Sequence, residues 1–255
     1  MVSPIDSSSI RPSPIFFGLL ALVGTAGYLA TTSFVPAKLA VFIFVVAGWV
    51  LSLVFHEFAH AFAAFKGGDH SVASKGYLTL DPRKYADPLT SLLLPCIFIL
   101  MGGIALPGGA VWINRGAIRS RATESVMSLA GPASNLVFGV VLVATIPLFG
   151  LADSQRTLAE AITVLAYFQI LAFVLNMLPV PGLDGFGAIE PHLSHEIQAQ
   201  IRPYRQYGIW ILIGALFFIP AVSRMFINIV QDVSTFVGLD RNLLRSGYDL
   251  FFFWR

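Results

Sequence analysis

Residues 39–65 read LAVFIFVVAGWVLSLVFHEFAHAFAAF, and this stretch decides the fold class. Residues 39–55 are uncharged and strongly apolar, and a helical pattern continues to residue 65. A helix of about 20 apolar residues crosses the hydrocarbon core of a bilayer. Three ionisable side chains, His56, Glu57 and His60, lie toward the end of the stretch. The sequence therefore predicts a membrane helix that carries a polar site.

The composition of the whole chain is that of a membrane protein. Of its 255 residues 56% are hydrophobic and 12% are charged, whereas soluble domains have about 45–50% and about 25%. Four more uncharged runs reach or approach the length of a crossing: 13–37, 125–152, 161–183 and 206–223. A further uncharged run, 88–114, is broken by proline and glycine. We therefore expect an all-α polytopic membrane protein with about five or six transmembrane helices, in which 88–114 is a re-entrant or interfacial segment.

The composition also argues against an intramolecular disulfide and against a nucleic-acid partner. The single cysteine, Cys96, cannot form an intramolecular disulfide. The Lys and Arg residues behind the net charge of +2 are scattered and form no basic stripe, so we expect no nucleic-acid partner. The expected environment is the lipid bilayer.

His56, Glu57 and His60 form the pattern H-E-x-x-H. Positions i and i+4 share one face of a helix, so both imidazoles can reach one tetrahedral zinc ion at about 2.0–2.1 Å. Glu57 lies alongside, where it could accept a proton from water at the metal. The short pattern also occurs by chance in unrelated helices. In a membrane helix, however, a charged residue at the centre costs about 2.5–3.5 kcal/mol, which favours a bound metal.

A catalytic zinc site needs a third protein ligand. Asp184 is a candidate, because it is the first charged residue after the uncharged run 161–183. Its position alone is equally typical of a capping residue where a helix ends at a Pro/Gly turn. The two interpretations stay open on this evidence.

Three segments taken together resemble the motifs of the site-2 protease family. Residues 56–60 (HEFAH) match its H-E-x-x-H, residues 131–135 (GPASN) match its G-P-x-x-N, and residues 176–185 (NMLPVPGLDG) match its N-x-x-P-x-x-x-L-D-G. The similarity extends over roughly 50–190. It is closest to a compact bacterial branch without a PDZ domain or an appended regulatory domain.

The resemblance implies one zinc ion, bound by His56, His60 and Asp184. It implies that Glu57 is the general base and that Asn176 helps to hold substrate or to stabilise the oxyanion. We expect residues 1–255 to form a single integral-membrane protease domain with a motif-bearing core at about 39–190. Two departures from the branch, at 84–85 and 107–112, lie where substrate contacts are expected.

The direction of the helices follows from the site. The histidines lie toward the end of their helix, and Asp184 follows the end of its own, so the two helices must run in the same direction to meet. One crossing, 125–152, separates them, and 88–114 then does not cross. This arrangement places ten Lys and Arg residues on one side and two on the other. The positive-inside rule predicts that the first side, which holds the site, is cytoplasmic. The expected location is the cell membrane, and the side of the C-terminal tail stays open.

We therefore predict a zinc-dependent endopeptidase that cleaves membrane-protein substrates in the bilayer. The alternative is a membrane metal-binding or scaffold protein that keeps the ligands without proteolysis, but a structural zinc site needs no general base such as Glu57. A transporter is disfavoured, because no inverted repeat is visible. The sequence leaves substrate identity, a regulatory or degradative role, and the oligomeric state open.

Other polar residues receive weaker interpretations. His70 is expected to be a solvated loop residue. Residues 190–196, which hold two His and two Glu, are expected to be a cytoplasmic surface rather than a second metal site. Asn135 either braces the zinc site or hydrogen-bonds a neighbouring helix, and the sequence does not separate these roles.

Overall fold

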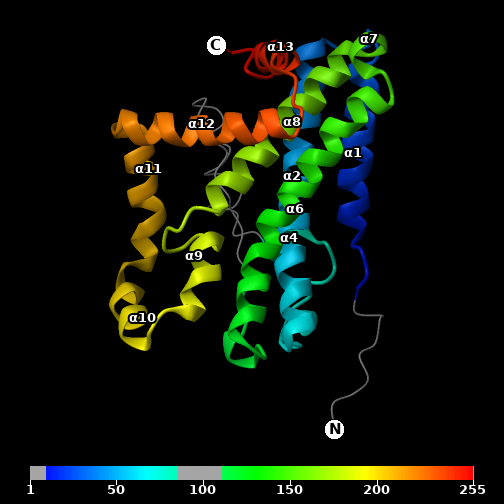
Figure 1. Ribbon diagram of the computed structural model, residues 1–255. Coiled ribbons are helices and arrows are strands. Elements are labelled where there is room, and N and C mark those ends of the chain that lie inside the picture. The colour runs from blue at the N-terminus through cyan, green and yellow to red at the C-terminus, as the bar shows by residue number, and fades with distance from the viewer. Residues whose placement is uncertain (1–9, 86–110, 255) are drawn as a thin grey trace.

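The protein is all-α in the part of the chain that its computed structural model describes, residues 10–85 and 111–254 (Figure 1). These residues contain helices and no strand. The expected all-α membrane fold is confirmed. Most of the expected re-entrant segment 88–114 lies outside the described residues.

Among the described residues, three helices are long and apolar enough to cross a membrane: α2 (Ala37–Gly67), α6 (Arg121–Leu148) and α8 (Arg156–Asn176). A shorter apolar helix, α1 (Pro14–Ala30), packs against α2. Helix α8 is the central helix, because 83% of an 18-residue apolar stretch of it is buried, against 33% of the corresponding stretch of α6. These four helices form the bundle that supports the site (Figure 1).

The last apolar run, 206–223, whose crossing the sequence left open, is divided between two helices. Helix α11 (Gly208–Phe218) has 11 residues, about 16 Å at 1.5 Å per residue, which is too short to cross alone. Pro220 begins α12 (Pro220–Phe236), and the chain bends there by 98°. Proline lacks the N–H that would continue the preceding helix. With residues 195–218 and α12 counted together as one bent span, the described residues hold up to four spans.

The remaining elements are short. They are α3 (Ser71–Ser74), α4 (Pro82–Tyr85), η3 (Arg115–Ala117), α7 (Leu151–Ser154), α9 (Asp184–Ile189), η4 (Glu190–His192), α10 (His195–Ile201) and η5 (Arg202–Tyr207), together with the C-terminal α13 (Arg241–Phe251). Helix α13 packs on α8 and α2 at the end of the bundle opposite the N-terminus (Figure 1).

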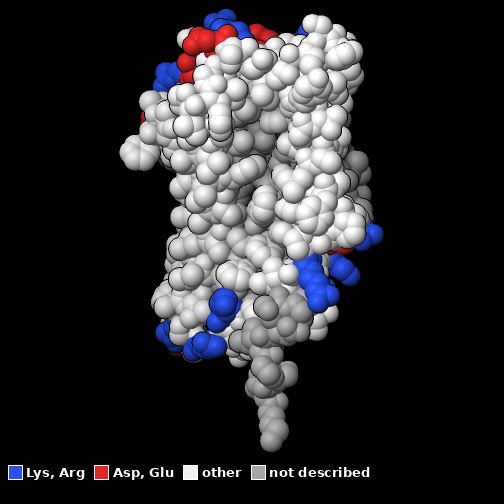
Figure 2. Space-filling model, turned by 90° about the vertical axis from the view of Figure 1, so that its right-hand side faces the viewer, with Lys and Arg blue, Asp and Glu red and all other residues white. Residues whose placement is uncertain are grey.

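Helices α2 and α8 run in the same direction, and α6 runs between them in the opposite direction (Figure 1). This is the arrangement required for His56, His60 and Asp184 to meet. Gly48 of α2 permits close contact with α8, because a Cβ there would collide with Leu165. Figure 2 shows a broad band without charged side chains between two charged ends, as expected for a protein surrounded by lipid.

Candidate metal centre

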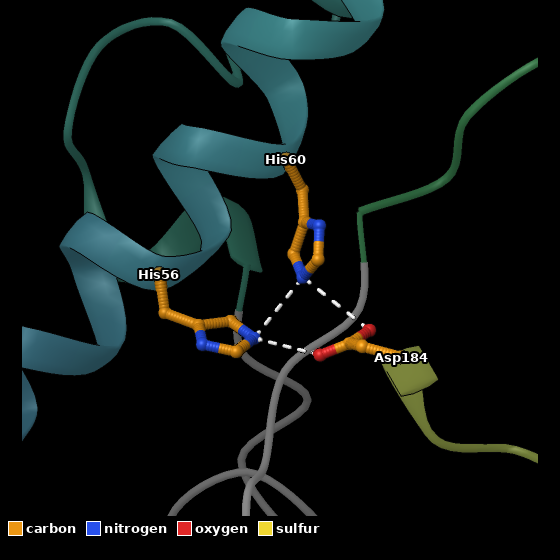
Figure 3. Close-up of side chains that lie close together, drawn as sticks. All are labelled: His56, His60 and Asp184. Carbon is orange, nitrogen blue, oxygen red and sulfur yellow. Dashed lines mark hydrogen bonds and ion pairs between the residues drawn. The ribbon is translucent and has the colours of Figure 1, made fainter. Parts of the chain in front are cut away.

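The side chains of His56, His60 and Asp184 converge on one point (Figure 3). The Nε2 atoms of His56 and His60 are 3.1 Å apart. Asp184 is the first residue of α9, and its Oδ2 and Oδ1 lie 3.3 Å from His56 Nε2 and 3.4 Å from His60 Nε2. Tetrahedral bonds of about 2.0–2.2 Å place ligand atoms about 3.3–3.6 Å apart. The three side chains therefore fit a zinc ion.

Hydrogen bonds on the far side of each imidazole fix its orientation. His60 Nδ1 donates to the carbonyl oxygen of Met127 at 2.8 Å. A carbonyl oxygen can only accept, so the proton is on Nδ1 and the Nε2 lone pair faces the centre. His56 Nδ1 is bonded to Asn135 Oδ1 in the same way. Partners of this kind set the tautomer of metal-binding histidines.

Asn135 combines the two roles that the sequence left open. Its Oδ1 bonds to His56 on α2, and its Nδ2 donates to Gln169 Oε1 on α8 at 2.9 Å. All three side chains are buried. The asparagine of the G-P-x-x-N motif therefore both orients a histidine and connects three helices.

The glycine of the same motif, Gly131, leaves space that a larger residue would fill. A Cβ on Gly131 would lie 2.6 Å from His56 Nε2 and closer still to His60 Nε2. Real Cβ contacts under 3.0 Å essentially do not occur. Any side chain at Gly131 would thus occupy the space between the two nitrogens.

Glu57 lies beside the three converging residues rather than among them. It is buried, with 5% of its surface exposed. The position suits a proton acceptor next to a metal.

A cavity of about 620 Å³ opens onto these side chains. Asn176, at the end of α8, lines it with an exposed fraction of 3%, and its Nδ2 has no acceptor among the described residues. A buried amide donor without a partner is costly unless something else binds it. Asn176 is thus available to a molecule in the cavity.

Several residues of the cavity wall could not be found by sequence motifs. Arg115 and Arg205 line the cavity and both bond to Glu190, with Oε2 of the carboxylate 2.9 Å from Arg115 Nη1 and 3.1 Å from Arg205 Nη2. The side chain of Glu190 is only 15% exposed. Glu190 thus pairs with two arginines of the cavity wall, a contact that the expectation of a surface segment at 190–196 did not include.

The other candidates lie apart from the centre. Within 10–85 and 111–254, His56, His60 and Asp184 are the only group of three or more His, Cys, Asp or Glu side chains placed to share an ion. His192 bonds instead to Ser125 Oγ at 2.9 Å. His70 is exposed and contacts the Phe65 ring edge to face.

Comparison with known proteins identifies the class. The chain is 42% identical over 250 residues to "Putative zinc metalloprotease Rip2" of Mycolicibacterium smegmatis, which covers 96% of this chain and 95% of the relative. It is 43% identical over 250 residues to the protein of that name from Mycobacterium tuberculosis (strain H37Rv), with the same coverage. It is 32% identical over 181 residues to "Putative zinc metalloprotease YwhC" of Bacillus subtilis, covering 68% of this chain and 80% of the relative.

No protein-family model and no solved structure matches the chain. Its motifs, fold and relatives nevertheless define an integral-membrane zinc metalloprotease with one zinc ion. The chain belongs to the site-2 protease family, as a compact member.

Proposed function

We propose that the protein is an intramembrane endopeptidase that hydrolyses peptide bonds of membrane-protein substrates, and that residues 1–255 form one protease domain. The observation that carries the proposal is the convergence of His56, His60 and Asp184 within 3.4 Å of one another, with Glu57 beside them on a cavity. A purely structural zinc site would need neither the cavity nor a neighbouring carboxylate.

His56, His60 and Asp184 would hold the zinc, and all three line the cavity. Zinc bound there would polarise the scissile carbonyl and lower the pKa of water. Glu57 would take the proton of the attacking water and pass it to the leaving amine. The unpartnered Nδ2 of Asn176 would donate to the oxygen on which negative charge develops.

The depth of the site determines which bonds can be cut. His56 and His60 lie ten and six residues before Lys66, the basic residue in the last turn of α2, or about 15 and 9 Å along the helix. With that end on the cytoplasmic side of the cell membrane, cleavage takes place in the inner part of the bilayer. A helical substrate must unwind there, because a helix keeps its carbonyls in internal hydrogen bonds.

The test is to compare the membranes of cells that produce the wild-type protein or the Glu57→Gln variant by quantitative proteomics. The variant should bind zinc normally, and one or more single-span proteins should accumulate uncut. The matched control is Glu196→Gln, which changes an exposed glutamate of α10. If no membrane protein differs between wild type and Glu57→Gln in both length and amount, the proposed activity is wrong.

A further inference from the structure

Asp69 is a buried carboxylate just beyond the zinc-site helix. It follows Gly68, the C-cap residue of α2, and has an exposed fraction of 2%. Its Oδ1 accepts from the nearby Ser71 N–H at 3.0 Å. Its Oδ2 accepts from the N–H of Asn114, 45 residues further along the chain, at 2.7 Å. Asp69 thus ties the end of α2 to a distant segment.

That segment, residues 111–114, forms one wall of the catalytic cavity. Val111, Trp112 and Ile113 all line the cavity, and none of residues 111–114 belongs to a helix. With no helical hydrogen bonds of its own, such a segment depends on outside partners for its position. Lys75 supplies a second one, since its Nζ donates to the carbonyl oxygen of Trp112 at 2.7 Å.

The chain just after this segment is also docked on the end of α2. The N–H of Arg119 donates to the Gly67 carbonyl oxygen at 3.1 Å. Gly68 has a φ of 124°, and a Cβ there would lie 2.6 Å from the Ala117 carbonyl oxygen. A residue with a side chain would be strained in that backbone conformation, and its Cβ would also push Ala117 away.

The same segment borders the space in which the proposed base would act. Val111 and Glu57 line the same cavity, and Val111 lies three residues before Asn114, whose N–H Asp69 holds. The position of residues 111–114 therefore shapes the space around Glu57.

We infer that Asp69 is a positioning residue for the reaction: by holding Asn114 it fixes residues 111–114, the cavity wall that borders the space in which Glu57 would act. The inference rests on the proposed function of Glu57 as general base. A misplacement of about 1 Å in a catalytic group can cost about 100-fold in rate. Loss of the Asp69 carboxylate should therefore lower the turnover number without removing zinc.

Asp81 provides a matched control. It is also a buried aspartate, with an exposed fraction of 5%, and its Oδ1 accepts from the N–H two residues ahead, Arg83, at 3.0 Å. Its Oδ2 accepts from the Arg83 guanidinium at 2.8 Å instead of from a cavity-lining segment. Asp81→Asn therefore perturbs a similar local turn without affecting residues 111–114.

The experiment uses full-length protein in detergent, with dye-labelled β-casein as an unfolded probe substrate. For Asp69→Ala we expect full zinc content, faster hydrogen exchange in residues 111–116, and a turnover number lower by about 10–100-fold at saturating substrate. Asp69→Asn can keep one of the two bonds and should have a smaller effect. Asp81→Asn should match the wild type in exchange and turnover.

Two further variants separate the possible failures. Lys75→Met removes the other anchor of the segment from an exposed site, so it should loosen residues 111–116 and slow turnover even if Asp69→Ala does not fold. Unchanged exchange in Asp69→Asn and Lys75→Met, or faster exchange with wild-type turnover, would overturn the inference. If wild type and Glu57→Gln cleave β-casein equally, the proposed function fails, and the inference fails with it.

Discussion

Replacing Gly131 by alanine should place a methyl group in the metal position. The new Cβ would lie 2.6 Å from His56 Nε2 and 2.7 Å from His56 Cε1. Ordinary van der Waals contact begins at 3.4 Å, so the imidazole would have to move by roughly 0.8 Å, several times the tolerance of a metal–ligand bond. The backbone of α6 cannot yield easily, because the Met127 carbonyl of the same helix holds His60.

We expect the dissociation constant for zinc of Gly131→Ala, measured by competition with a chelator, to rise by at least about 100-fold. Loss of a residue that merely orients a ligand costs about 10–100-fold, and this change displaces two ligands at once. The matched control is Gly139→Ala, eight residues further along α6, where a Cβ would meet Gln169 Cβ at 3.2 Å and no imidazole. Wild-type zinc affinity in Gly131→Ala would refute the geometry of the site.

Three further outcomes follow from the structure. Asn135→Ala should weaken zinc binding by about 10–100-fold, because the His56 imidazole loses its partner; chelator competition measures this. Asn176→Ala should keep its zinc and cleave β-casein about 100–1000-fold more slowly, because the cavity loses its unpartnered donor. Hydrogen bonds from Arg83 lower the pKa of Asp81 from 3.8, so the stability that this pair adds should be complete above the unfolded pKa and disappear as the pH falls through the folded one. Asp81→Asn should therefore lower the thermal unfolding midpoint at pH 7 by more than at pH 3.

The sequence was sufficient for the fold class and for the convergence of the site. The length of the apolar runs predicts α2, α6 and α8, because a bilayer requires helices of that length. The need for His60 and Asp184 to meet predicts that α2 and α8 run in the same direction, as they do (Figure 1).

The sequence was insufficient wherever a tertiary contact determines the outcome. Hydrophobicity alone does not show the 98° bend at Pro220, since the residues on both sides are apolar. The carbonyl oxygen of Met127, which holds His60, belongs to a backbone that every residue has, so no motif reveals it. The partners of Glu190 are Arg115 and Arg205, which are 75 and 15 residues away in the chain.

The most direct test of the central claim is the zinc content of Asp184→Ala compared with that of the wild type and Glu57→Gln. We expect one zinc per chain in the wild type and in Glu57→Gln, because Glu57 lies beside the three converging side chains and is not one of them. We expect Asp184→Ala to lose most of its zinc on dialysis against a chelator, since only two ligands remain. An Asp184→Ala protein that retains a full zinc ion under the same dialysis would contradict the three-ligand site.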